Sequence, residues 1–228
     1  ITAQSPPGAL NWNISFTNPH YLGAAGMMLG NDAKMMAQYA GKTYASKPIF
    51  WNSPYGSSHG QSCSSCHAAQ NTRHSFEIDL ATTVPGGTYH GAANTQTCKA
   101  CHDAHLPNGL ETVRTEYEER SAELYAAIQE YSKNGANFTG GVAVPVCYDG
   151  AAYPYWFKDT NADGVCDATE SLTANSTKFN PKASKAAFNY KWTQAEPGAW
   201  AHNEVYVFQV IFDTLEDLGY TPTTWTRP

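Results

Sequence analysis

The sequence has no long apolar run, little charge and no excess of basic residues. No stretch approaches the roughly 18 apolar residues that a membrane-spanning helix requires, which excludes a membrane span. Charged residues make up 15% of the 228 residues and the net charge is −6. Because an acidic chain is repelled by the phosphate backbone, nucleic-acid binding is excluded as well.

Residues 1–5 carry neither the basic nor the apolar segment of a signal peptide. Thr, Asn, Ser and Gly are abundant, as is typical of exported proteins with long surface loops. Aromatic residues amount to 13% of the chain, enough to build a core and to exclude a disordered protein. We expect a mature chain whose signal has been removed, located outside the cell, on its surface or in the periplasm.

The residue pattern predicts a mainly α fold with extensive coil and few helices. Residues 205–212 have strand propensity, but a helix is expected because one helical stripe is formed by Val205, Phe208, Ile211, Phe212, Leu215 and Leu218. No pair of alternating strands with a hairpin turn stands out. We expect two regions, a loop-rich one at 1–110 and a helical one at 111–228, together one continuous unit. The predicted helices are 23–40, broken near Gly30; 111–133; 182–191, after an Asn–Pro N-cap; and 205–218, ending at Gly219.

Two copies of the pattern C-x-x-C-H are the strongest signal in the sequence. Two thiols three positions apart can both reach the vinyl groups on one edge of a heme, and the next histidine can bind the iron. The pattern therefore predicts two c-type hemes. We expect residues 1–110 to be the diheme-binding region, with the few helices packed around the two covalently bound hemes. The attachment residues and proximal ligands are Cys63, Cys66 and His67 for the first motif, and Cys98, Cys101 and His102 for the second.

A zinc site with four cysteine ligands is the alternative explanation of these motifs. The 31 residues between Cys66 and Cys98 exceed the roughly 15 to 20 that such sites use. A histidine also follows both cysteine pairs. A redox dithiol would require a βαβ context, for which the sequence gives no sign. These observations favour heme.

The second axial ligand of each iron decides between electron transfer and chemistry at the metal. Histidines outside the motifs are numerous enough to fill both distal positions, although each alone could be a surface residue. Four methionines at 27, 28, 35 and 36 could also serve, but their spacing favours core packing. The distal candidates are His20 and His74, with His59 and His90 in reserve, and His105 exposed or serving another chain.

Residues 159–170 match the calcium-loop pattern D-x-[DN]-x-[DN]-G-x5-E at every position. Oxygen ligands at these spacings can surround one Ca²⁺, with Gly164 at the sharp turn. The flanking residues 153–157 do not look helical, so we expect a solitary structural loop; a solvated acidic turn is the alternative. The predicted ligands are Asp159, Asn161, Asp163, the carbonyl of Val165, Asp167 and Glu170.

Cys147 and Cys166 belong to neither heme motif. In an exported chain two leftover thiols most simply form a disulfide, which would tie the calcium-type loop to residues 146–148. Two buried free thiols are the alternative.

The sequence resembles the exported multiheme c-type cytochromes of metal-reducing and related anaerobic prokaryotes. The resemblance implies closely stacked bis-His hemes, with His20 and His74 as distal ligands and His202 as a further one. Some members form extracellular filaments in which a histidine of one subunit ligates a heme of the next. Two hemes are few for a member of this length. The resemblance is carried by the heme motifs and by residues 18–22, 39–44, 74–78, 187–190, 198–203 and 213–218.

These observations predict a diheme electron carrier without substrate turnover. Its partners would be redox proteins or extracellular acceptors, with homopolymeric assembly and heme ligation in trans as a further hypothesis. A diheme enzyme, such as a peroxidase or a small reductase with one open iron site, is the alternative. A third hypothesis makes the second half an assembly module.

Overall fold

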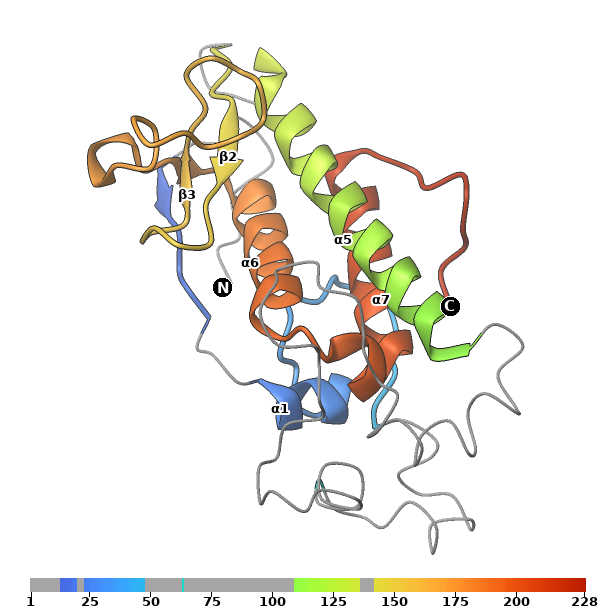
Figure 1. The fold of residues 1–228 in the computed structure, drawn as a ribbon. Helices are drawn as coiled ribbons and strands as arrows, with labels where there is room; N and C mark the ends of the chain where they lie inside the picture. Colours follow the sequence, from blue (N-terminus) through green and yellow to red (C-terminus); the bar gives the residue numbers. More distant parts are fainter. Residues whose placement is uncertain (1–12, 20–22, 48–62, 64–108, 136–141) are drawn as a thin grey trace, which may run out of the picture. The chain divides into compact units, whose positions relative to one another are not determined.

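The computed structural model describes residues 13–19, 23–47, 63, 109–135 and 142–228. Contacts divide the chain into two units, residues 1–46 with 118–228, and residues 47–117. The sequence-based boundary at residue 110 stays a prediction. The described elements (Figure 1) are β1 (Ile14–Ser15), α1 (Ala24–Leu29), the 3-10 helix η1 (Gly30–Asp32), α5 (Gly109–Lys133), β2 (Val146–Tyr148), β3 (Trp156–Lys158), the 3-10 helix η4 (Thr173–Asn175), β4 (Lys178–Phe179), α6 (Pro181–Ala195) and α7 (Ala199–Leu218).

Helix α5 confirms the helix predicted at 111–133. Its apolar stripe is buried, with Leu124 and Ile128 almost inaccessible. The stripe packs against α6, where Tyr125 stacks on Tyr190 with ring centroids 5.0 Å apart. Burial of such a stripe, rather than helix propensity alone, is what stabilises a helix in a folded domain.

Helix α6 begins at the predicted cap. The Asn180 side chain accepts a hydrogen bond from the Ala183 amide at 2.8 Å, and Pro181 occupies the first turn. The Asn180 amide group also donates to the Tyr131 hydroxyl at 3.0 Å, which ties the cap to α5. The helix continues to Ala195, four residues beyond the predicted end at Lys191.

Helix α7 confirms that residues 205–218 are helical. It ends at Gly219, which has φ 95° in the left-handed region that glycine tolerates. The buried stripe differs from the predicted one, because Tyr206 and Val207 are fully buried whereas Val205 is 38% exposed. Helices α6 and α7, joined by the turn at residues 196–198, lie against each other (Figure 1).

The helix predicted at 23–40 is confirmed only in its first part. It breaks at Gly30 as expected, and the helical backbone ends at Asp32. Beyond it, the Ala37 amide bonds to the Asn189 side chain at 2.7 Å and the Met36 amide to the Tyr206 hydroxyl at 3.2 Å. Long-range partners on α6 and α7 thus replace the carbonyls that would continue the helix.

The structure contains pairs of short strands that the sequence did not indicate. Strand β2 pairs antiparallel with β3, and β1 pairs antiparallel with β4, each as a two-stranded sheet. Each strand has two or three residues. A segment this short cannot show the alternation from which strands are predicted. Buried Trp156 and Phe157 nevertheless place β3 in the core.

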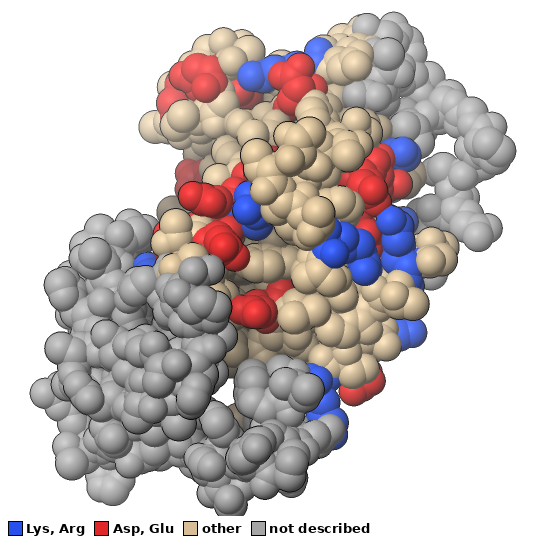
Figure 2. All heavy atoms as spheres, turned by 90° about the vertical axis from the view of Figure 1, so that its right-hand side faces the viewer, with Lys and Arg blue, Asp and Glu red and all other residues tan. Residues whose placement is uncertain are grey.

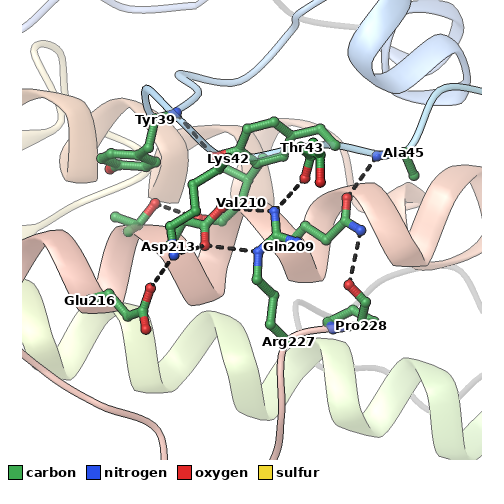
Figure 3. Close-up of polar contacts among 12 residues, drawn as sticks. Tyr39, Lys42, Thr43, Ala45, Gln209, Val210, Asp213, Glu216, Arg227 and Pro228 are labelled. Atoms are coloured by element: carbon green, nitrogen blue, oxygen red, sulfur yellow. Dashed lines mark hydrogen bonds and ion pairs between the residues drawn. The ribbon is translucent and has the colours of Figure 1, made fainter.

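The C-terminal segment is held on α7 (Figure 3). Arg227 donates to both carboxylate oxygens of Asp213, at 2.9 and 3.0 Å, and to the Thr43 carbonyl. Lys42 lies 3.4 Å from the same carboxylate, which is fully buried. Both the C-terminus and the segment around Thr43 are therefore fixed to one buried acid.

Candidate heme-ligand and calcium sites

Most of the predicted heme-binding residues lie outside the described residues. Cys63 is described, is exposed and forms no disulfide. Its attachment to a heme stays a prediction. The candidates that lie outside are Cys66, His67, Cys98, Cys101, His102, His20, His59, His74, His90 and His105.

Of the distal candidates, the structure describes His202, in the first turn of α7. Its Nδ1 lies 3.0 Å from Oε1 of Glu196. Glu196 is 5% exposed and caps the C-terminus of α6, where its amide donates to the Trp192 carbonyl at 3.0 Å. Because Nδ1 faces this carboxylate, any metal bound by His202 must be bound through Nε2.

A kink directly after His202 separates the first turn of α7 from the rest. Asn203 has φ −165° and ψ 76°, and its side chain accepts from the Tyr206 amide at 3.2 Å, so that it caps the longer part of the helix. Its amide group donates to the Ser46 carbonyl at 2.8 Å. The kink gives the turn that carries His202 a direction different from that of the helix body.

The predicted calcium loop makes the internal hydrogen bonds of a compact oxygen-lined turn. Asp159 Oδ2 accepts from the Gly164 amide at 2.8 Å, Asn161 Oδ1 from Asp163 at 2.9 Å, and Asp163 Oδ1 from Val165 at 2.8 Å. Gly164 has φ 87°, a backbone conformation that favours glycine, as the motif requires.

Two acids of this loop are buried at its base. Asp159 is 3% exposed, and its Oδ1 is buried without a hydrogen-bond partner. Glu170 is 1% exposed, and its Oε1 accepts from the Thr160 amide at 2.6 Å and the Thr160 hydroxyl at 2.7 Å. An orphaned buried carboxylate oxygen is costly, so it fits a cation ligand.

The carboxylates are not gathered around one point, however. Within the described ranges, no group of three or more His, Cys, Asp or Glu side chains is arranged to hold a metal ion. Glu170 instead binds the amides of its own loop, and hydrogen bonds from Thr160 lower the pKa of its carboxyl. Hydrogen bonds from Thr169 likewise lower the pKa of Asp167. The calcium site stays a prediction.

The loop is anchored to its surroundings at two places. Cys166 forms the predicted disulfide with Cys147 of β2, which confirms that pairing. The Gly164 carbonyl accepts from Gln129 at 2.7 Å and from the Tyr125 hydroxyl at 3.0 Å, both on α5. The loop is thus tied to a strand and to a helix.

Two charged residues with tertiary contacts carry no recognisable signal in the sequence. Glu196 has no motif signal, because its partner is defined by the turn between α6 and α7. Lys191 is 4% exposed and lies 3.8 Å above the Tyr155 ring, and it donates to the Tyr148 hydroxyl at 2.9 Å. A buried lysine held by aromatic rings is visible only once the fold is known.

Charge of one sign does not dominate the described surface on the face drawn in Figure 2. Acidic and basic side chains lie interspersed there among uncharged residues. Over the described part of the chain, no helix is both long and apolar enough to cross a membrane.

Comparison with known proteins adds a decisive observation. Over 218 residues, 89% of this chain, the sequence is 28% identical to the C-type polyheme cytochrome OmcB of Geobacter sulfurreducens, in two strains, and 27% identical to OmcC of the same species. The chain is related to the polyheme c-type cytochromes. It spans about a quarter of the length of these curated relatives, 27% for OmcB and 26% for OmcC. No protein-family profile and no solved structure matches the chain.

The matched relatives are polyheme c-type cytochromes by name. This match agrees with the family resemblance seen in the sequence. It also favours heme over a zinc site at the paired C-x-x-C-H motifs.

Proposed function

We propose that the chain is an exported diheme c-type cytochrome that transfers electrons through two closely spaced hemes, each ligated by two histidines. The single observation that carries the proposal is the pair of C-x-x-C-H motifs in a chain related to polyheme cytochromes. The bound hemes would supply reversible one-electron chemistry at iron. In this proposal the protein carries electrons and does not turn over a substrate.

The residues of the chain would attach, ligate and bury the hemes. The cysteines of each motif form the thioether bonds, and His67 and His102 bind the irons from the proximal side. His20 and His74 are the first choices for the distal positions, with His59 and His202 as further candidates. Of these, His202 has the supporting geometry, because a carboxylate holds its Nδ1.

Absorption and electron paramagnetic resonance spectra of the purified protein test this ligation. We expect low-spin spectra at both hemes in both oxidation states, without binding of CO or peroxide, because six-coordinate iron has no open position. The alternative, a diheme peroxidase or small reductase, requires one high-spin heme that binds CO. A high-spin component would therefore favour the enzyme.

We also propose that residues 159–170 bind one structural Ca²⁺. The support is the complete loop pattern together with the buried, unpartnered Oδ1 of Asp159. The ligands would be Asp159, Asn161, Asp163, Asp167 and Glu170 with the Val165 carbonyl. Glu170 would exchange hydrogen bonds to its own loop for the cation.

Thermal unfolding of the heme-loaded protein with EGTA and with added Ca²⁺ tests this site. At a concentration 100 times the Kd, the bound ion stabilises the fold by about 2.7 kcal/mol, which raises the Tm. Glu170→Gln should abolish the increase. Val165→Ala is the matched control, because this side chain is 67% exposed and only its carbonyl is a ligand. An unchanged Tm in the unaltered protein would identify a solvated acidic turn instead.

The location and partners of the protein follow from the same proposal. We place it outside the cell, on its surface or in the periplasm, where it exchanges electrons with redox proteins or extracellular acceptors. Because the net charge is −6, a soluble partner should present a basic face, and its association should weaken as salt is added. Histidines that are not used as axial ligands within the chain would permit homopolymers in which a histidine of one subunit ligates a heme of the next. Electron microscopy of native material would show filaments if such homopolymers form and single particles if they do not.

A further inference from the structure

We propose that Glu196 is the positioning residue for His202 as an axial ligand of one heme. The carboxylate would hold the imidazole with Nε2 as the iron-binding nitrogen. The inference rests on the proposed heme function. It assigns a role to a residue that no motif identifies.

The geometry around this pair is built by the backbone. Glu196 is the C-cap of α6, and its carbonyl accepts from the Ala199 amide at 3.1 Å. The His202 amide bonds to the Gly198 carbonyl at 2.9 Å. The acid and the imidazole, six residues apart, are thus fixed on the two sides of one tight turn.

Gly198 leaves the space in which the two side chains meet. A Cβ at this position would lie 2.9 Å from Cε1 of His202 and 3.2 Å from Oε1 of Glu196. A side chain at this position would push the imidazole or the carboxylate aside. The backbone φ of −91° is open to any residue, so close packing of the pair, rather than conformation, explains the glycine.

A carboxylate on the second ring nitrogen is the arrangement that metal-binding histidines commonly use. It fixes the tautomer and the ring orientation, and it makes the imidazole a more basic ligand. A more basic axial ligand stabilises oxidised iron and lowers the reduction potential of that heme. Glu196 is 5% exposed and His202 is 17% exposed at its side chain, so water screens the pair weakly.

Spectroelectrochemistry of the diheme protein and of its Glu196→Gln variant tests the role of the carboxylate. We expect the midpoint potential of one heme to become more positive and its low-spin g values to change, with the other heme unaffected. Gly198→Ala displaces the pair without changing the charge. It should shift the midpoint potential of the same heme. Glu216→Gln is the control, because it removes the same charge from a half-exposed site.

His202→Ala supplies the second measurement. If the inference holds, one heme of this variant loses its low-spin signature. The inference would be overturned if both hemes of His202→Ala stay low-spin. It would also be overturned if Glu196→Gln leaves both midpoint potentials unchanged. Heme content by the pyridine hemochrome assay, measured on every sample, separates these results from failure of the cytochrome proposal, in which no heme c is found.

Discussion

Tyr190 is packed among aromatic rings of α5, β2 and β3, with Tyr125 stacked on it and Tyr148 at 5.1 Å edge to face. Burial raises the pKa of Tyr190, and it also raises those of Tyr125 and Tyr206. A raised pKa keeps these phenols neutral in the fold, whereas unfolded tyrosines ionise near about pH 10. Their contribution to stability is complete below that pH and is lost as the pH rises above it.

We therefore expect the free energy of unfolding to fall steeply above about pH 10. Urea unfolding followed by circular dichroism at several pH values from neutral to alkaline measures this. Tyr190→Phe should make the fall shallower, because one ionising group is removed from the unfolded chain. Equal slopes in the variant and the unaltered protein would argue against burial of this phenol.

Single residues were predictable where a local rule fixes them. The Asn180 cap and the pairing of the two leftover cysteines follow from neighbouring residues and from elimination. Glu196 was not predictable, since nothing within its own helix marks it. Its importance depends on the turn that brings it to His202.

Helix α7 consists of two segments joined at Asn203, and the joint depends on one buried side chain. Asn203→Ala would remove the cap of the longer segment and leave the Ser46 carbonyl without its 2.8 Å donor. We expect a loss of about 1 to 3 kcal/mol in unfolding free energy, the cost of an unsatisfied buried group. Leu172→Ala, at a 52% exposed position, should change it by less than about 0.5 kcal/mol. Equal losses of unfolding free energy in the two variants would show that the Asn203 cap does not stabilise the fold.

The Cys147–Cys166 disulfide spans 19 residues between β2 and the calcium-type loop. Replacing both cysteines by serine should cost about 3 kcal/mol, because the unfolded chain gains the conformations that the bridge excludes. Chemical denaturation of both proteins measures the difference. Heme absorption serves as the control, since thioether attachment at other cysteines is untouched. A variant as stable as the parent would mean that the pairing is incidental.

At the scale of elements, long helices were predictable and short strands were not. Helices α5 and α7 bury stripes long enough to be recognised from periodicity. The predicted helix at 23–40 failed beyond Asp32 because Asn189 and Tyr206, far along the chain, capture its amides. Partners of this kind are decided by the tertiary fold.

Asp213 joins distant parts of the unit formed by residues 1–46 and 118–228 (Figure 3). Removing its main partner by Arg227→Met would leave a buried carboxylate with Lys42 at 3.4 Å. We expect a cost of about 3 kcal/mol, the lower end for a broken buried ion pair. Unfolding in urea measures it, with Lys158→Met at an exposed position as control. A cost below about 0.5 kcal/mol would show that the Arg227–Asp213 pair contributes no more than a solvent-exposed ion pair.

For the whole molecule, the sequence predicted a mainly α fold and a heme-binding chain, because both depend on short-range patterns. The pairing of residues 13–46 with the C-terminal helices could not be read from it. That arrangement depends on hydrogen bonds such as the one between the Ala45 amide and Gln209, more than 160 positions apart.

The presence of two covalently attached hemes is the claim on which the account depends. Intact-mass spectrometry of the purified protein, combined with a pyridine hemochrome assay, tests it most directly. We predict a mass larger than that of the polypeptide by two hemes and a c-type spectrum of two hemes per chain. A colourless protein with the mass of the bare chain, or with zinc in place of iron, would contradict it.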